Sequence, residues 1–269
     1  MEKVKAKKRY GQNFLKDDNV LTKIIESMPN NNNHIVEIGP GLGDLTKNLV
    51  KYKDVTAYEV DTDLLSILRD KFASNIEDAS LNLIHTDVLE AWDKQNSLHD
   101  SKYDLIANLP YYIATNIILR AFEDDNCEHI IVMIQKEVAL KFSANVGDKE
   151  FSSLAVIAKQ NSKDVRILFD VPATSFEPPP KVVSSVLFIK KDSSKRLDKD
   201  FNKFLKACFV QPRKKLSKNI SSILNKELIS DIFKELEISD NVRPHEVSSS
   251  LYSQIYTKAI NGREQDTSK

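Results

Sequence analysis

Long apolar runs are missing from this sequence of 269 residues, and cysteine is scarce. No stretch approaches the roughly 18 consecutive apolar residues that a membrane-spanning helix needs. The first residues are basic, as in a signal peptide, but no apolar segment follows Arg9, so secretion is not supported. The two cysteines, Cys127 and Cys208, lie far apart, which argues against a disulfide framework or a metal site. We therefore expect a cytoplasmic protein with reduced thiols, no metal and no membrane contact.

An excess of charge of one sign is also missing, because 39 basic residues balance 39 acidic ones. The balance hides an asymmetry. Residues 190–269 contain 17 Lys and Arg against 11 Asp and Glu, whereas residues 1–189 contain 22 against 28. A basic second part of the chain is a weak indication of a nucleic-acid surface.

Seven apolar, strand-like runs alternate with segments whose apolar residues have helical spacing. These runs are His34–Ile38, Val55–Val60, Leu81–His85, Tyr103–Ala107, His129–Ile134, Val165–Val171 and Ser185–Ile189. Such alternation predicts an α/β fold of the Rossmann-like kind, with a seven-stranded, mostly parallel sheet. A charged, polar stretch follows, and helical spacing returns beyond it. We expect a first domain at 1–192, with a basic arm at 1–15, and a small all-helical domain at 197–269.

A glycine loop follows the first of these strands directly. Gly39, Gly41 and Gly43 form G-x-G-x-G, which permits a sharp turn and close approach of a ligand to the main chain. A dinucleotide-binding fingerprint has its third glycine one position later, where this chain has Asp44. An anionic side chain there would repel a pyrophosphate but tolerate S-adenosylmethionine, which has no phosphate. The loop thus disfavours a nicotinamide dehydrogenase.

Two acidic residues follow the next two strands. Glu59 lies at the end of the second strand, where a carboxylate can accept hydrogen bonds from both ribose hydroxyls. Asp87 follows the third strand and could accept a hydrogen bond from the exocyclic amine of an adenine. Either residue could instead cap a strand end. Because open α/β sheets bind ligands at the carboxyl ends of their strands, the coincidence of loop and acids favours a cofactor site.

The fourth strand ends in Asn108-Leu109-Pro110-Tyr111. An adenine amine is a poor nucleophile because its lone pair is delocalised into the ring. The side-chain oxygen of Asn108 and the carbonyl of Leu109 can accept its two N–H bonds and direct the lone pair at a methyl group. Pro110 stiffens the turn, and Tyr111 offers a face for a flipped-out base. The turn therefore predicts methyl transfer to adenine without a metal.

In their order along the chain these motifs resemble the ribosomal RNA adenine dimethyltransferase family, in particular its small-subunit members. The resemblance covers nearly the whole length. It is carried by Arg9–Leu15, Glu37–Gly43, Asn108–Tyr111, Gln135–Val138, Pro179–Val182, Gln211–Leu216 and Arg243–Pro244. It implies dimethylation of two adjacent adenines in a hairpin near the 3′ end of small-subunit rRNA. The implied substrate is a maturing small subunit, and nothing in the sequence demands more than a monomer.

The resemblance also implies roles that spacing does not show. Phe176 would stack on the face of the target base opposite Tyr111. The cofactor would be held by Asn13 and the Leu15 main chain, Gly39 and Gly41 at its methionine end, Glu59 at its ribose, Asp87 and Val88 at its adenine, and Asn108. Three features depart from the pattern. Ser175-Phe176-Glu177 keeps the aromatic residue but alters its neighbours. Tyr112 stands where small-subunit members often carry Asn, and Val183 where Asp is usual.

The densest basic cluster is Arg213, Lys214, Lys215 and Lys218. On a helix, Lys214 and Lys218 would share one face, opposite an apolar stripe. The cluster is either a solvated helix face or a contact with RNA phosphates, and the resemblance favours the contact. Three residues of the arm would add to it: Lys7, Lys8 and Arg9.

Three alternatives stay open. Related enzymes that methylate large-subunit rRNA and confer antibiotic resistance typically carry Ile where this chain has Leu109. A non-catalytic assembly or transcription factor could share the fold, although the intact Asn108 and Tyr111 count against it. DNA adenine methyltransferases usually carry a second proline in the turn, where this chain has Leu109-Pro110.

Overall fold

The protein is described here by a computed structural model that covers residues 6–267. The chain forms two compact units. The first contains residues 6–139 with Lys163–Arg196, and the second contains Leu140–Ser162 with residues 197–267. The second unit thus includes residues 140–162, which the sequence analysis placed within the domain at 1–192. The reason is packing, because the helix at 153–161 lies against helices of the C-terminal segment.

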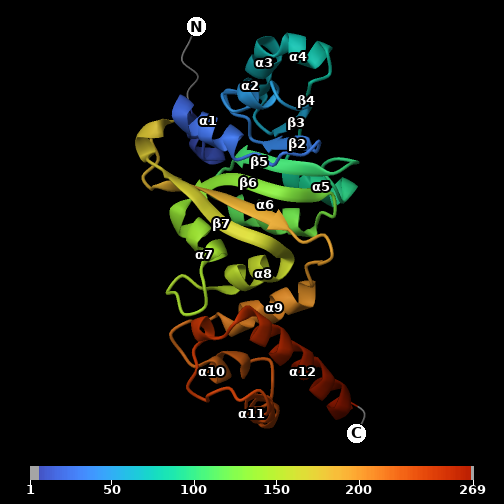
Figure 1. The fold of residues 1–269 in the computed structure, drawn as a ribbon, viewed down its shortest axis with the longest axis vertical. Coiled ribbons are helices and arrows are strands. Elements are labelled where there is room, and N and C mark those ends of the chain that lie inside the picture. The colour runs from blue at the N-terminus through green and yellow to red at the C-terminus, as the bar shows by residue number, and fades with distance from the viewer. Residues whose placement is uncertain (1–5, 268–269) are drawn as a thin grey trace. The chain divides into compact units, whose positions relative to one another are not determined.

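The first unit is built on one seven-stranded sheet in the order β4-β3-β2-β5-β6-β9-β7 (Figure 1). Its strands are β2 (His34–Ile38), β3 (Val55–Glu59), β4 (Leu81–His85), β5 (Tyr103–Asn108), β6 (Cys127–Gln135), β7 (Ser162–Val171) and β9 (Ser184–Lys191). The strands from β4 to β6 are parallel, and β9 is antiparallel to β6. The predicted α/β fold with a mostly parallel sheet is confirmed, and all seven predicted strands are present.

The central strands are mainly apolar and largely buried because both faces of the sheet are covered. Every residue of β3 is buried, as are the last four of β2. The helices of this unit are α1 (Asp18–Glu26), α2 (Thr46–Leu49), α3 (Thr62–Lys71), α4 (Ala73–Glu77), α5 (Val88–Gln95), α6 (Ala114–Glu123) and α7 (Lys136–Ser143), the last of which runs into the second unit. Three aspartates are the N-caps of α1, α3 and α5, because each carboxylate accepts a hydrogen bond from a main-chain N–H of the first turn: Asp17, Asp61 and Asp87.

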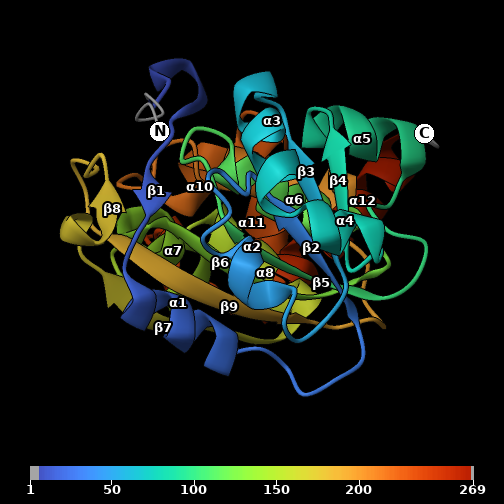
Figure 2. The ribbon, with the colours of Figure 1, turned by 90° about the horizontal axis from the view of Figure 1, so that it is seen from above.

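A second, two-stranded sheet joins segments that are far apart in the sequence. Strand β1 (Phe14–Leu15) pairs antiparallel with β8 (Phe176–Glu177), so that Leu15 lies opposite Phe176. Figure 2 shows the two strands side by side, β1 in blue and β8 in gold. The pairing fixes the N-terminal arm beside the segment that follows β7 and the short helix Ala173–Ser175. The sequence analysis did not predict either strand.

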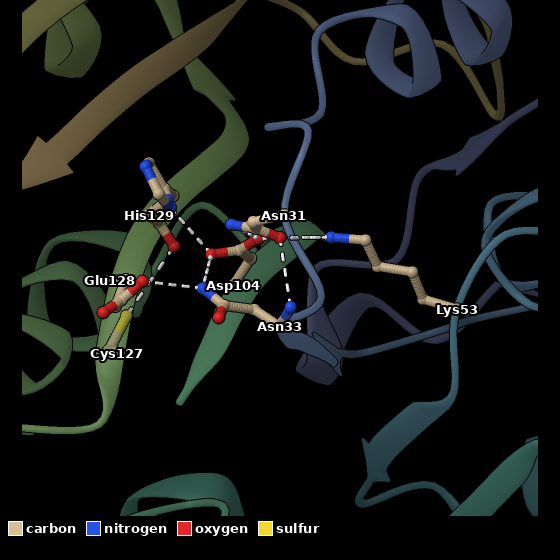
Figure 3. A network of polar contacts seen from close by, with 7 residues as sticks. All are labelled: Asn31, Asn33, Lys53, Asp104, Cys127, Glu128 and His129. Atoms are coloured by element: carbon tan, nitrogen blue, oxygen red, sulfur yellow. Dashed lines mark hydrogen bonds and ion pairs between the residues drawn. The ribbon is translucent and has the colours of Figure 1, made fainter. Parts of the chain in front are cut away.

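A buried polar network lies at the amino ends of β5 and β6 (Figure 3). Asp104, which is fully buried, accepts hydrogen bonds from Asn31, Asn33 and His129 at 2.8–3.0 Å, and the ammonium of Lys53 is 3.6 Å away. Burial would raise the pKa of Asp104, but the hydrogen bonds from His129 and the asparagines lower it below its ordinary value. The network ties the loop before β2 to two neighbouring strands, whose carboxyl ends lie at the opposite edge of the sheet.

The second unit is helical. Its elements are α8 (Ser153–Asn161), α9 (Lys199–Cys208), α10 (Leu216–Ile220), α11 (Lys226–Glu235), the short helix Pro244–Glu246 and α12 (Ser249–Thr267). Helix α12 contacts α8, α9 and α11. Aromatic rings pack between α9 and α12. The ring centroids of Phe209 and Tyr252 are 5.4 Å apart, and those of Phe201 and Tyr256 are 5.1 Å apart.

Membrane-spanning helices and metal-binding clusters do not occur in the described part of the chain. No helix within residues 6–267 is both long enough and apolar enough to cross a membrane. In the same residues, no three or more His, Cys, Asp or Glu side chains are grouped so that they could hold a metal ion. Cys127 and Cys208 are buried free thiols, and burial raises the pKa of Cys127 to about 12.

Candidate active site

One cavity lies where the loops after β2, β3, β4 and β5 meet. Because parallel strands end at the same edge of a sheet, these loops are brought together there. Its walls come from residues 10–15, 37–42, 44–45, 58–60, 64, 86–88 and 108–113. The empty space between these residues has a volume of about 980 Å³, which includes the part that is open to solvent. All eight predicted cofactor residues line it: Asn13, Leu15, Gly39, Gly41, Glu59, Asp87, Val88 and Asn108.

The glycines of the loop serve two different purposes. Gly41 has a positive φ of 60°, and a Cβ at this position would lie 3.1 Å from the ring of Phe14, so the arm packs directly on the loop. Gly43 does not line the cavity. A Cβ there would lie 2.5 Å from the ring of Phe72, which shows that this glycine is required for packing against the end of α3.

Asp44 lines the cavity, but its charge is not isolated. The ammonium of Lys16 lies 2.6 Å from its carboxylate. The repulsion of a pyrophosphate that the sequence analysis attributed to Asp44 is therefore weakened by this ion pair. The case against a dinucleotide then depends on the loop spacing and on the other residues of the cavity.

Two buried glutamates lie beside the loop. The carboxylate of Glu59, 5% exposed, accepts hydrogen bonds from the main-chain N–H groups of Val60 (2.9 Å) and Asp61 (2.8 Å), and burial raises its pKa. Glu37, 1% exposed, accepts a hydrogen bond of 2.6 Å from the hydroxyl of Thr46, and burial raises its pKa to about 8. Glu37 belongs to the motif Glu37–Gly43, but no role was predicted for it from the sequence. Its signal was an acidic residue within a buried apolar strand.

Asp87 caps a helix and also lines the cavity. One oxygen caps α5 by accepting a hydrogen bond of 2.8 Å from the main-chain N–H of Leu89. The same residue and the buried Val88 line the cavity. Capping therefore fixes the orientation of a carboxylate whose second oxygen can still accept a hydrogen bond from a ligand.

The predicted catalytic turn lies at the same cavity. The side-chain nitrogen of Asn108 donates a hydrogen bond to the main-chain oxygen of Asn13 at 3.1 Å, and the N–H of Leu109 donates to Met133 in β6 at 3.1 Å. With its nitrogen engaged by the arm, the amide of Asn108 offers its oxygen as an acceptor.

Tyr111 is held by a contact that the sequence analysis missed. Its hydroxyl lies 2.6 Å from the hydroxyl of Ser184, which is fully buried in β9, and burial raises the pKa of Tyr111. Tyr111 itself is half-buried and lines the cavity. Because 73 residues separate the partners, no local pattern could have indicated the pair.

Phe176 is not brought to the cavity. It is 5% exposed and belongs to a hydrophobic cluster with Leu15, its partner in the two-stranded sheet. A ring buried in this way presents no face to a base. Stacking of Phe176 on the target adenine thus has no support in this arrangement, since the ring would first have to leave the cluster.

The basic arm is attached to the edge of the cavity. The ammonium of Lys7 lies 2.6 Å from both Asp61 and Asp63, and Gln12 donates a hydrogen bond of 2.8 Å to Asp61. The predicted RNA contact of Lys7 is therefore not supported, because its charge is already paired. Arg9 is exposed and lies over the ring of Tyr10 at 4.6 Å. The side chain of Lys8 and all of residues 1–5 lie outside the described residues.

The C-terminal cluster differs from the predicted helix face. Helix α10 begins only at Leu216, so Arg213, Lys214 and Lys215 lie in the preceding loop, and Lys214 cannot share a helix face with Lys218. Asn219 holds this loop through hydrogen bonds to the main chain of Gln211 and Lys215. All four basic side chains are exposed, and within residues 6–267 no salt bridge involves them.

Comparisons with known proteins agree with this geometry. The family model described as "Ribosomal RNA adenine dimethylase" matches residues 3–261. The chain belongs to this family. The "Ribosomal RNA small subunit methyltransferase A" of Aliarcobacter butzleri is 76% identical over 263 residues, which cover 98% of this chain and 99% of that protein. The protein of the same name from Sulfurimonas denitrificans is 54% identical, with 96% of each chain covered.

Solved structures show the same fold at low identity. A dimethyladenosine transferase from Plasmodium falciparum is similar with a TM-score of 0.77 at 23% identity, covering 91% of this chain and 96% of that one. The 23S rRNA methyltransferase ErmE is similar with a TM-score of 0.70 at 20% identity, covering 92% and 100%. This member of the family is therefore a methyltransferase of Rossmann-like fold, and its RNA target has to be inferred from its close relatives.

Proposed function

We propose that this enzyme transfers methyl groups from S-adenosylmethionine to the N6 amines of two adjacent adenines in a hairpin near the 3′ end of small-subunit rRNA. The products are N6,N6-dimethyladenosines, formed on a maturing small ribosomal subunit in the cytoplasm by a monomeric protein. The observation that carries the activity is the position of the Asn108–Tyr111 turn at the same cavity as the glycine loop. The choice of small-subunit RNA rests on the names of the close relatives.

The residues of the cavity fit S-adenosylmethionine. Glu59 presents a buried carboxylate at the end of β3, suited to two ribose hydroxyls. Asp87 follows β4 and lines the cavity, and the oxygen that does not cap α5 is suited to an adenine amine. Among the described residues that line the cavity, none is Lys, Arg or His, which favours a ligand without a phosphate. When bound, the cofactor supplies a methyl group on a sulfonium.

The turn supplies the geometry of transfer. The oxygen of Asn108 and the carbonyl of Leu109 accept hydrogen bonds from the two N–H bonds of the target amine, so that the nitrogen lone pair faces the methyl group. A nitrogen–carbon bond forms as the sulfur–carbon bond breaks, and the amine then loses a proton to solvent. Tyr111, fixed by Ser184, presents its ring to the base. Positioning of this kind, without a metal or strong base, is sufficient for direct transfer.

Acceptor selectivity tests the proposal. Purified protein is incubated with tritiated S-adenosylmethionine and either immature small ribosomal subunits or naked large-subunit rRNA. Label in the small subunits alone supports the proposed substrate. Label in the large-subunit RNA alone would identify the enzyme as a large-subunit rRNA methyltransferase of the kind that confers antibiotic resistance. No transfer to either, with cofactor binding intact, would favour a non-catalytic assembly factor.

A further inference from the structure

Tyr112 is an exposed aromatic residue at the edge of the cavity. It follows the catalytic turn directly, lines the cavity and is 60% exposed. Tyr52, on the same unit, is similarly exposed at 64% but does not line the cavity. A large ring left open at a ligand site is available to bury its face against a ligand.

The ring of Tyr112 is located by its neighbours. A Cβ built on Gly11 would lie 3.4 Å from Cδ1 of Tyr112, so the ring lies against the main chain of the N-terminal arm. Burial raises the pKa of Tyr112, and the charge of Asp87, the hydroxyl of Tyr10 and the charge of Glu59 raise it further. Gln12, the residue after Gly11, donates a hydrogen bond of 2.8 Å to Asp61, two residues after Glu59, so the ring lies on the side of the cavity where β3 ends.

That side of the cavity is where an adenosyl group would bind, because Glu59 is suited to ribose hydroxyls and Asp87 to an adenine amine. Val60 and Val88 line the cavity beside these acids and supply apolar surface. An adenine presents two flat faces, and stacking on an aromatic side chain stabilises it without any requirement for a hydroxyl. The ring of Tyr112 is therefore in a position to cover a bound adenosine.

We propose that the Tyr112 ring covers the adenosine end of the bound cofactor and acts as a positioning residue that strengthens adenosyl binding. The inference rests on the proposed function, because it assumes an adenosyl ligand. It assigns the ring to the cofactor and not to RNA. The face of the ring carries the effect, so phenylalanine can replace tyrosine, whereas alanine and asparagine cannot.

Calorimetric titration with S-adenosylhomocysteine and with 5′-methylthioadenosine tests the inference. The second probe has the adenosine end but lacks the amino-acid end. Tyr112→Ala and Tyr112→Asn should each weaken the binding of both probes by on the order of tenfold. Tyr112→Phe should stay within about twofold of the unaltered protein. Tyr52→Ala, which removes an equally exposed ring outside the cavity, should leave both affinities unchanged.

Two results would overturn the inference. One is a Tyr112→Ala protein that binds both probes as tightly as the unaltered protein; if its KM for small subunits rises at the same time, the ring contacts RNA instead. The other is a loss of affinity for S-adenosylhomocysteine alone, which would place the ring at the methionine end. An unaltered protein that binds neither probe would contradict the proposed function itself, which is a separate result.

Discussion

At the scale of single residues, Asn108 is hydrogen-bonded to the arm and, in the proposed mechanism, accepts a hydrogen bond from the target amine. Asn108→Ala removes the acceptor oxygen, so we expect methyl transfer to be abolished. Affinity for S-adenosylhomocysteine should change by no more than about tenfold, or ~1.4 kcal/mol. Single-turnover transfer from labelled cofactor measures the first effect, and calorimetry measures the second. A large loss of affinity together with residual transfer would contradict the role assigned to Asn108.

Ser184 should act through Tyr111, because the two hydroxyls form one hydrogen bond. Removing a single neutral hydrogen bond changes a free energy by roughly 1 kcal/mol, so Ser184→Ala should lower kcat several-fold to tenfold. The KM for small subunits should change little. Tyr111→Phe breaks the same bond, and adding Ser184→Ala to it should have almost no further effect on kcat. Additive losses in this double-mutant cycle would show that Ser184 acts by another route.

The residues of the site differ in how far the sequence predicts them. Glycines, strand-end acids and the Asn108–Tyr111 turn belong to short motifs, and the structure places all of these motifs at one cavity. Ser184 and the pairing of Leu15 with Phe176 depend on contacts between distant segments, which no local pattern contains. The buried position of Phe176 has the same origin.

At the scale of elements, the buried carboxyl group of Glu37 in β2 makes the free energy of unfolding depend on pH. Burial raises its pKa in the folded chain to about 8, from an ordinary value of 4.5. The folded chain therefore holds this proton more tightly than the unfolded chain does. Its contribution to the free energy of unfolding is fully present below about pH 4.5 and is lost as pH rises towards 8.

Glu37→Gln removes this titration. Its melting temperature relative to that of the unaltered protein should rise between pH 5 and pH 8 and level off above that range. Over this range the difference in the free energy of unfolding between the two proteins should change by roughly a few kcal/mol at most. Thermal unfolding without ligand, in buffers across this range, measures it. A constant difference between the two proteins at every pH would show that Glu37 is ionised throughout.

The elements also show where periodicity is informative. All seven strands of the large sheet were predicted, because each contains a mainly apolar run long enough to be recognised in the sequence. Strands β1 and β8 contain two residues each, which is too short for any period. The basic residues at 213–215 follow Pro212 and end at the N-cap, Lys215, so the helical spacing assumed for them does not begin until Leu216.

At the scale of the whole molecule, the exposed cluster Arg213, Lys214, Lys215 and Lys218 should bind RNA phosphates. Changing the three lysines to glutamate should weaken binding to immature small subunits. The logarithm of the association constant should also fall less steeply with the logarithm of salt concentration. The slope should become shallower by about 0.7–0.9 for each phosphate that the protein no longer neutralises. Affinity for S-adenosylhomocysteine should not change. The matched control changes three exposed lysines of α9 and α11, Lys206, Lys226 and Lys234, to glutamate. An equal effect there would show that the cluster has no special role.

The division of the chain into a sheet-based unit and a helical unit follows from its composition, but the exact boundary does not. The change from strand runs to helical spacing near 190–200 predicts where the chain leaves the sheet. Residues 140–162 join the helical unit because α8 packs against α9 and α12. That choice depends on which face α8 buries, and the sequence between β6 and β7 is compatible with either unit.

The central claim is the identity of the product. Small ribosomal subunits from a strain that lacks its own dimethyltransferase are incubated with the protein and tritiated S-adenosylmethionine, and the methylated nucleotides are mapped. We expect N6,N6-dimethyladenosine at two adjacent positions near the 3′ end of small-subunit rRNA, and none with Asn108→Ala. Label at any other nucleotide, or none at these two adenines while the cofactor binds, would contradict the account.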